Sequence, residues 1–180
     1  MGIDPGANGG LAVVSAAGSV EMVCRMPQTE GDLARLFEAE IAPMGITSCL
    51  IEAVHAFPDQ GVASAFTFGR GAGVIVGLLL AHKIRFEEIR PQAWQKLLGI
   101  PPRAKRPRKP RPFIQYPPEE SQSQWKNRLR SKAQQLFPGV EVTLAVADAL
   151  LIAETCRRIH AGMQLLGRAY RETEERIVAE

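Results

Sequence analysis

The 180-residue sequence predicts one α/β domain, with a mixed central sheet and helices on both of its faces. Its length suits a single domain that can bury a substantial core. Two short apolar segments on either side of a glycine-containing turn, residues 11–15 and 20–26, predict a β-hairpin. Helical and strand patterns then alternate along the chain, which indicates that further strands are joined to the sheet through helices.

The other predicted elements follow from local patterns. A short first strand ends at the Asp-Pro-Gly turn of residues 4–6, and the apolar run 48–52 is typical of a buried central strand. Further strands are expected at 84–89 and, as a weaker candidate, at 140–143. Helices are expected at 32–42, 61–82, 91–98, 121–136, 145–160 and 163–179, from apolar spacing and from proline and glycine at their ends.

The predicted helix 61–82 carries Gly69, Gly73 and Gly77 at intervals of four residues, so they share one side. Because glycine weakens a helix, we expect this side to admit the close approach of another backbone. The richest apolar run, Gly71 to Ala81, is expected to be too short to span a bilayer.

Three cysteines, Cys24, Cys49 and Cys156, are widely spaced in apolar surroundings, which favours reduced core thiols over a disulfide framework. The N-terminus shows no basic stretch followed by an apolar one, so no secretory signal is expected. We therefore expect a cytoplasmic protein with no membrane partner.

Positive charge is concentrated in one segment. Residues 103–132 contain ten lysines and arginines against two glutamates, a local net charge of +8, although the whole chain carries only +3. Residues 101–118 are also rich in proline, which excludes regular structure there. A basic segment on an otherwise acidic body favours a polyanionic partner over the alternative of a solvated charged loop.

Three carboxylates occupy positions that suit metal chemistry: Asp4 and Glu52 end predicted strands, and Asp148 lies in the first turns of an apolar helix. A carboxylate among small apolar neighbours is costly to bury unless a cation offsets the loss of hydration. Oxygen donors of this kind suit Mg²⁺ or Mn²⁺. The alternative is that each acid has only a local role, in a turn, an ion pair or a helix cap. No histidine has a neighbour at the spacing of a zinc site.

Five motifs, in this order along the chain, resemble those of RuvC-like Holliday junction resolvases, and most closely those of the bacterial, phage and chloroplast branch. They are GIDPG at 2–6, IEAVH at 51–55, RPQAWQK at 90–96, KNRLRSKAQQLFP at 126–138 and ADALLIA at 147–153. The resemblance covers most of the chain except residues 101–124 and the C-terminal tail. GIDPG alone is weak, because sugar-kinase and heat-shock ATPases open similarly, but an ATPase would need a second nucleotide-binding half.

The resemblance implies an RNase H-like fold, a homodimer, two Mg²⁺ or Mn²⁺ ions, and paired nicks across a four-way DNA junction. It places Asp4 as the ligand bridging the ions, Glu52 and Asp148 as further ligands, and Lys126 as a catalytic cation at the scissile phosphate. The glycine-bearing helix becomes a candidate dimer element, with simple packing on the sheet as the alternative. Further contacts with DNA are expected from basic residues: Arg70, Arg103, Lys105, Arg106, Arg108, Lys109, Arg111, Arg130 and Lys132.

Two departures from the family pattern affect these expectations. The family usually has a fourth acidic or histidine ligand three or four residues before the last acid, where this chain has Ala145 and Leu144. Another group, such as Glu141 or a DNA phosphate, would have to complete the second metal site. The second departure is a Pro/Arg-rich basic insert at about 101–120, which the compact family members lack. A junction-binding protein without cleavage, and a nuclease acting on flaps or RNA–DNA hybrids, therefore stay open as alternatives.

Overall fold

The structure, a computed structural model, describes residues 1–53, 61–105, 113–115 and 118–179, and the side chains up to residue 163. A five-stranded mixed sheet forms its centre, with the strand order β3-β2-β1-β4-β5. The strands are β1 (Gly2–Asp4), β2 (Gly10–Val14), β3 (Val20–Arg25), β4 (Cys49–Glu52) and β5 (Phe86–Ile89). β1, β2 and β3 are antiparallel neighbours, whereas β4 pairs in parallel with both β1 and β5. The predicted hairpin and mixed sheet are confirmed.

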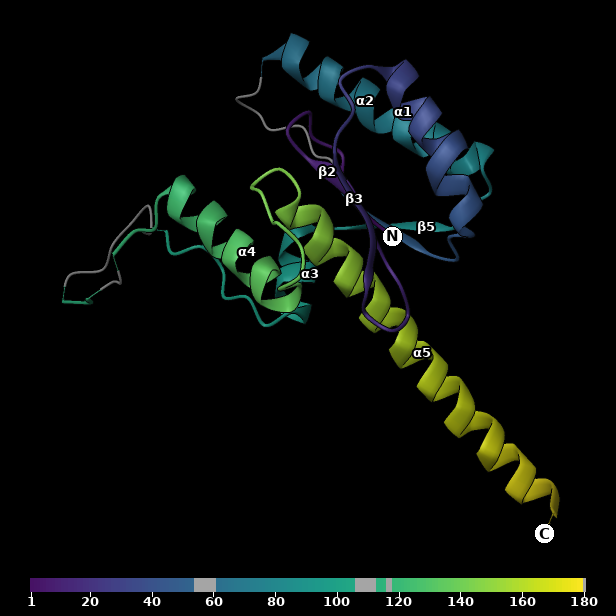
Figure 1. The fold of residues 1–180 in the computed structure, drawn as a ribbon. Coiled ribbons are helices and arrows are strands. Elements are labelled where there is room, and N and C mark those ends of the chain that lie inside the picture. Colours follow the sequence, from purple (N-terminus) through teal and green to yellow (C-terminus); the bar gives the residue numbers. More distant parts are fainter. Residues whose placement is uncertain (54–60, 106–112, 116–117, 180) are drawn as a thin grey trace.

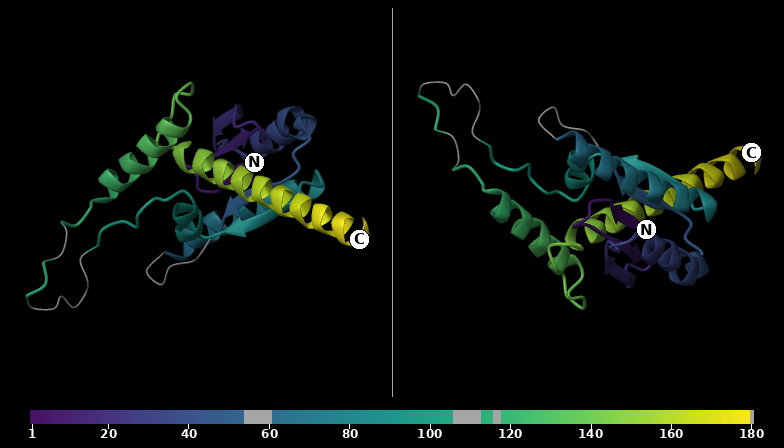
Figure 2. Two further views of the ribbon diagram at one scale, coloured as in Figure 1. Left: turned by 90° about the horizontal axis from the view of Figure 1, so that it is seen from below. Right: turned by 90° about the horizontal axis from the view of Figure 1, so that it is seen from above.

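Helices cover both faces of the sheet, as predicted (Figure 1). They are α1 (Glu30–Leu36), which continues through a π-helical turn (Phe37–Ile41) and a 3₁₀ turn (Ala42–Met44), α2 (Val62–Ala81), α3 (Pro91–Leu97), α4 (Gln122–Leu136) and α5 (Ala147–Ala179). α1 and α2 lie on one side of the sheet, and α3, α4 and α5 on the other. α5 projects beyond the sheet at its C-terminal end (Figure 2).

Alternation along the strands divides the buried side chains between two cores. Ile3, Leu11 and Ile51 belong to the core under α1 and α2. Ala12 and Leu50, on the opposite parity, belong to the core under α3, α4 and α5. Because successive side chains of a strand point to opposite faces, this division also fixes which way the strand-end residues point.

α5 packs directly against β1. A Cβ atom on Gly2 would lie 2.1 Å from the backbone nitrogen of Ala153 and 2.5 Å from the carbonyl oxygen of Ala149. Glycine is therefore required at position 2, because any side chain would push the helix off the strand.

Two predicted elements are wrong. The C-terminal helices expected at 145–160 and 163–179 form one continuous helix, α5, because a single glycine at 162 does not break it. Residues 140–143 form no strand, because the side chain of Gln134 binds their backbone instead: its Nε2 donates to the carbonyl oxygen of Val140 (2.8 Å), and its Oε1 accepts from the Val142 amide (3.2 Å).

α2 differs from expectation in two ways. Nothing in the described part of the chain lies within 4 Å of a Cβ placed on Gly69, Gly73 or Gly77, so no described backbone approaches these glycines. α2 is also long and apolar enough to cross a membrane by length and composition alone, whereas the run 71–81 had been expected to be too short. The predicted apolar run begins at Gly71, but the small and aromatic residues that precede Gly71 make the apolar part of the helix longer. Only Ile75 and Leu79 of α2 are buried.

Candidate metal centre and nucleic-acid surface

Asp4 and Glu52 lie side by side at one edge of the sheet. Gly2 is paired with Leu50, and Ile3 with Ile51, in the parallel ladder of β1 and β4. The next residue on each strand is a carboxylate. Asp4 shares the parity of Gly2, and Glu52 that of Leu50, so both acids point to the face covered by α5.

Asp148 approaches this edge from α5. It lies in the first turn of the helix, next to Ala149, whose carbonyl oxygen packs against Gly2. All three acids are partly buried.

The pKa shifts indicate that the three carboxyl groups share one region. Burial and, to a smaller extent, the charges of Asp4 and Asp148 raise the pKa of Glu52 to about 7, although a hydrogen bond from Trp94 lowers it. Burial and the charge of Asp4 raise the pKa of Asp148 to about 7, opposed by Lys126. Burial also raises the pKa of Asp4, opposed by the Gly6 amide and by Lys126. The structure therefore brings the four predicted catalytic residues close enough for their charges to interact: Asp4 acts on Glu52 and Asp148, and Lys126 acts on Asp4 and Asp148.

Asp4 has a local role in its turn, whereas Glu52 does not form the ion pair that was its alternative. Oδ1 of Asp4 does accept from the Gly6 amide (3.1 Å), so Asp4 shapes the turn as well as facing the other acids. A Cβ on Gly9 would lie 2.5 Å from Cγ of Asp4, so the turn needs glycine there. Glu52 accepts a hydrogen bond from the indole of Trp94 (2.8 Å) instead of pairing with an arginine.

The donor set fits a hard divalent cation, because three carboxylates with raised pKa values gain most from a neighbouring positive charge. In the described part of the chain, however, no three Asp, Glu, His or Cys side chains form a ready-made cluster for a metal. The expected fourth-ligand positions hold a buried Ala145 and a half-exposed Leu144. Glu141 is exposed and is not among the charges that shift the three acids.

The predicted DNA-contacting residues separate into groups. Arg130 is exposed and Lys132 partly buried on α4, the helix that also carries Lys126, and Lys105 is exposed beside the insert. Arg103 donates to the carbonyl oxygen of Glu120 (2.9 Å) and to the side chain of Gln122, so its head group is engaged within the chain. Arg106, Arg108, Lys109 and Arg111 lie outside the described residues.

A clasp of side chains at the base of the insert was not predicted. Arg128 of α4 forms two hydrogen bonds with the carboxylate of Glu120 (2.9 and 2.7 Å) and a third with the carbonyl oxygen of Pro101 (3.0 Å), and its guanidinium stacks on Trp125. The clasp joins the two ends of the insert to one helix. The only sequence signal was the closeness of a glutamate and an arginine eight positions apart, which alone is unspecific.

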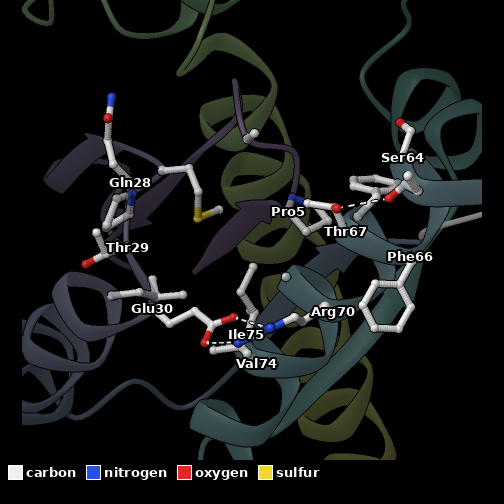
Figure 3. A pocket seen from close by; sticks show the side chains of 17 residues that line it. Pro5, Gln28, Thr29, Glu30, Ser64, Phe66, Thr67, Arg70, Val74 and Ile75 are labelled. Carbon is white, nitrogen blue, oxygen red and sulfur yellow. Dashed lines mark hydrogen bonds and ion pairs between the residues drawn. The ribbon is translucent and has the colours of Figure 1, made fainter.

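A cavity of about 890 Å³ lies between α1 and the N-terminal half of α2 (Figure 3). Arg70 and Glu30 face each other across it in an ion pair (2.8 Å). Pro5 and Ala7 line its edge, but Asp4, Glu52 and Asp148 do not line it. Arg70, a predicted DNA contact, is thus engaged with an acidic partner in this structure.

Comparisons with solved structures decide the fold. Thermus thermophilus RuvC is 17% identical and covers 92% of this chain and 95% of its own, with a TM-score of 0.53. The chain has the fold of RuvC. T. thermophilus RuvC in complex with a Holliday junction substrate is 15% identical, covers 86% of this chain and 89% of its own, and gives a TM-score of 0.52. RuvC has an RNase H-like fold, so that predicted fold is confirmed. No family model and no curated protein sequence matches the chain.

Proposed function

We propose that the protein is a structure-specific endodeoxyribonuclease that resolves four-way DNA junctions by hydrolysis dependent on Mg²⁺ or Mn²⁺. The observation that carries the proposal is the convergence of Asp4, Glu52 and Asp148 on the α5 face at one sheet edge, with Lys126 beside them. The fold shared with RuvC, one of whose structures holds a Holliday junction, supports DNA as the substrate.

Each of these four residues has a role in the proposed reaction. Asp4, Glu52 and Asp148 would hold two divalent ions, with Asp4 placed between the other two acids. The ions would activate water and stabilise the leaving oxygen of the phosphodiester. Lys126, on α4, would place a positive charge against the scissile phosphate as negative charge develops there. Arg130 and Lys132 on the same helix would bind the flanking backbone.

A labelled synthetic four-way junction tests the proposal. With Mg²⁺ or Mn²⁺ we expect paired nicks placed symmetrically across the junction, and none with EDTA. Asp4→Asn should remove cleavage while it preserves binding, because it removes one charge and keeps the side chain's shape. A linear duplex of the same sequence is the matched control. Equal cutting of duplex and junction would refute structure specificity, and faster cutting of flaps or RNA–DNA hybrids would assign another RNase H-like nuclease activity.

A second candidate function, junction binding without cleavage, is favoured by Ala145 and Leu144 at the expected fourth-ligand positions. The same assay separates the two functions, because binding without metal-dependent nicks would establish the second. Ala145→Asp then asks whether the missing ligand limits cleavage. A gain of cleavage in this variant, with unchanged junction affinity, would show that the fold and the remaining ligands are competent.

We also propose that the protein is a homodimer through α2. Val62, Phe66 and Leu80 of this helix are exposed, and its three aligned glycines leave room for a second backbone. Sedimentation velocity should show a dimer that Gly73→Arg converts to a monomer, whereas Gly139→Arg, at another glycine with open space around it, should not. A monomeric wild-type protein would refute the proposal.

A further inference from the structure

The geometry points to Trp94 as the residue that positions Glu52 for metal binding. This inference rests on the proposed function, because it assigns a role inside the same metal centre. Its basis is one contact: Nε1 of Trp94 donates to Oε2 of Glu52 at 2.8 Å. A carboxylate has two oxygens, so a bond to Oε2 orients the group and leaves Oε1 its full capacity to bind a cation.

The topology of the sheet places Trp94 at this position. Glu52 is paired with Ile89, the last residue of β5, in the parallel ladder of β4 and β5. Arg90 follows at once and Pro91 opens α3, so the first turn of α3 begins directly beside the end of β4. Trp94 lies one turn into α3, which follows β5. Its side chain therefore reaches the carboxylate of Glu52 at the end of the adjacent strand, β4.

The indole cannot swing away from Glu52. Trp94 is 1% exposed and belongs to the core that also contains Leu50, Leu98 and Leu150. Close-packed interiors hold side chains in single rotamers. The surrounding core thus holds the indole of Trp94 in one position, and its hydrogen bond holds the carboxylate of Glu52 in one orientation.

A neutral donor suits this place better than a charged one. An arginine or lysine would orient Glu52 equally well, but its positive charge would compete with the metal for the carboxylate. An indole N–H donates one hydrogen bond, carries no charge and has no acceptor atom. The hydrogen bond therefore sets the orientation of Glu52 in advance without placing a competing positive charge beside it.

The test measures Mn²⁺ binding to the DNA-free protein by the electron paramagnetic resonance signal of unbound Mn²⁺. Trp94→Phe keeps an aromatic ring but removes the N–H donor and some of the buried ring volume, so a packing control is needed. We expect Trp94→Phe to lower Mn²⁺ affinity by about 10–100-fold, the usual effect of losing a partner that orients a metal ligand. Leu98→Ala, in the same core and without a polar atom, should lower thermal stability but leave Mn²⁺ affinity unchanged.

Two further measurements separate positioning from packing. In a Glu52→Gln background, adding Trp94→Phe should cause no further loss of Mn²⁺ affinity. Trp94 is proposed to act only through the carboxylate of Glu52, and that carboxylate is already absent. In Trp125→Phe, Trp94 is the sole tryptophan, and Mn²⁺, a paramagnetic quencher, should quench its emission with the same dissociation constant that the resonance signal reports.

Unchanged Mn²⁺ affinity in Trp94→Phe, or an equal loss in Leu98→Ala, would overturn the positioning role while the metal centre stands. Trp94 emission that does not respond to bound Mn²⁺ would overturn it too. A wild-type protein that binds no Mn²⁺ would overturn the metal centre and, with it, this inference.

Discussion

Replacing Asp148 by asparagine should abolish cleavage and yet stabilise the metal-free protein at alkaline pH. The folded-state pKa of Asp148 is about 7, against an ordinary value of 3.8, because of burial and the charge of Asp4. A group with a raised pKa favours the folded state fully below its unfolded pKa, and this advantage is lost as pH rises to the folded value. The 3.2-unit difference corresponds to roughly 4 kcal/mol of destabilisation above pH 7. Relaxation of the site reduces this to roughly 2–4 kcal/mol.

Calorimetry in EDTA at pH 5 and pH 8 measures the effect. At pH 8 Asp148→Asn should melt roughly 5–15 °C above the wild type, since each kcal/mol shifts Tm by about 2–4 °C in a chain of this size. The difference should shrink towards pH 5. Mn²⁺ should raise the Tm of the wild type but not that of the variant. An Asp148→Asn protein no more stable than the wild type at pH 8 would refute the crowding of like charges on which the site rests.

Glu154 supplies a control of opposite sign on the same helix. Burial acts to raise the pKa of Glu154, but hydrogen bonds from Arg157 and Arg158 outweigh it and hold the pKa below its usual range. A lowered pKa contributes stability above the unfolded value, and this contribution is lost as pH falls. Glu154→Gln should therefore destabilise the protein at pH 8, in the assay where Asp148→Asn stabilises it.

Three more predictions follow from the described contacts. Gly9→Ala should lower cleavage by about 10²-fold, since its Cβ would displace Asp4, whereas Gly139→Ala, in open space, should leave the rate unchanged; equal rates would refute the tight turn. If about six phosphates are contacted, log K for the junction should fall against log salt with a slope near −5, and Arg130→Gln should make the slope shallower by about 1; a flat response would remove the basic residues from binding. Arg128→Ala should release the clasp and speed tryptic cleavage of the insert, and unchanged proteolysis would contradict it.

The sequence was sufficient for the parts of the fold that follow from short-range periodicity. Alternation and turn residues predicted β2 and β3, and the apolar run before Glu52 predicted β4. The carboxylates could be selected because an acid that ends an apolar strand has few inexpensive structural reasons to be there. Asp4 and Glu52 can lie side by side only if β1 and β4 are neighbours in the sheet, and the parallel pairing of β1 with β4 meets this condition.

Features that depend on long-range contacts could not be predicted. Residues 140–143 have strand-like composition, but the side chain of Gln134 takes their backbone hydrogen bonds, a contact that local pattern does not reveal. The glycines of α2 are predicted to meet another backbone, but none of the residues that the structure describes brings its backbone close to Gly69, Gly73 or Gly77. Trp94 belongs to the motif at 90–96, which was identified only by its resemblance to the family. Nothing in the sequence indicates that the indole of Trp94 reaches Glu52 on the neighbouring strand.

The close packing of α5 on β1 accounts both for the metal affinity expected of the candidate metal centre and for its instability without metal. Gly2 lets α5 lie directly on β1, and this close approach brings Asp148 down to Asp4 and Glu52 while it excludes much of the water. Without a cation the three acids lose hydration on burial, and Asp4 also repels Glu52 and Asp148; the raised pKa values express both costs. A divalent ion would convert the repulsion into binding free energy, so the instability of the metal-free site and its affinity for metal should rise and fall together. Gly2→Ala, by lifting the helix, should therefore weaken Mn²⁺ binding and lower the pKa of Asp148 in the same variant.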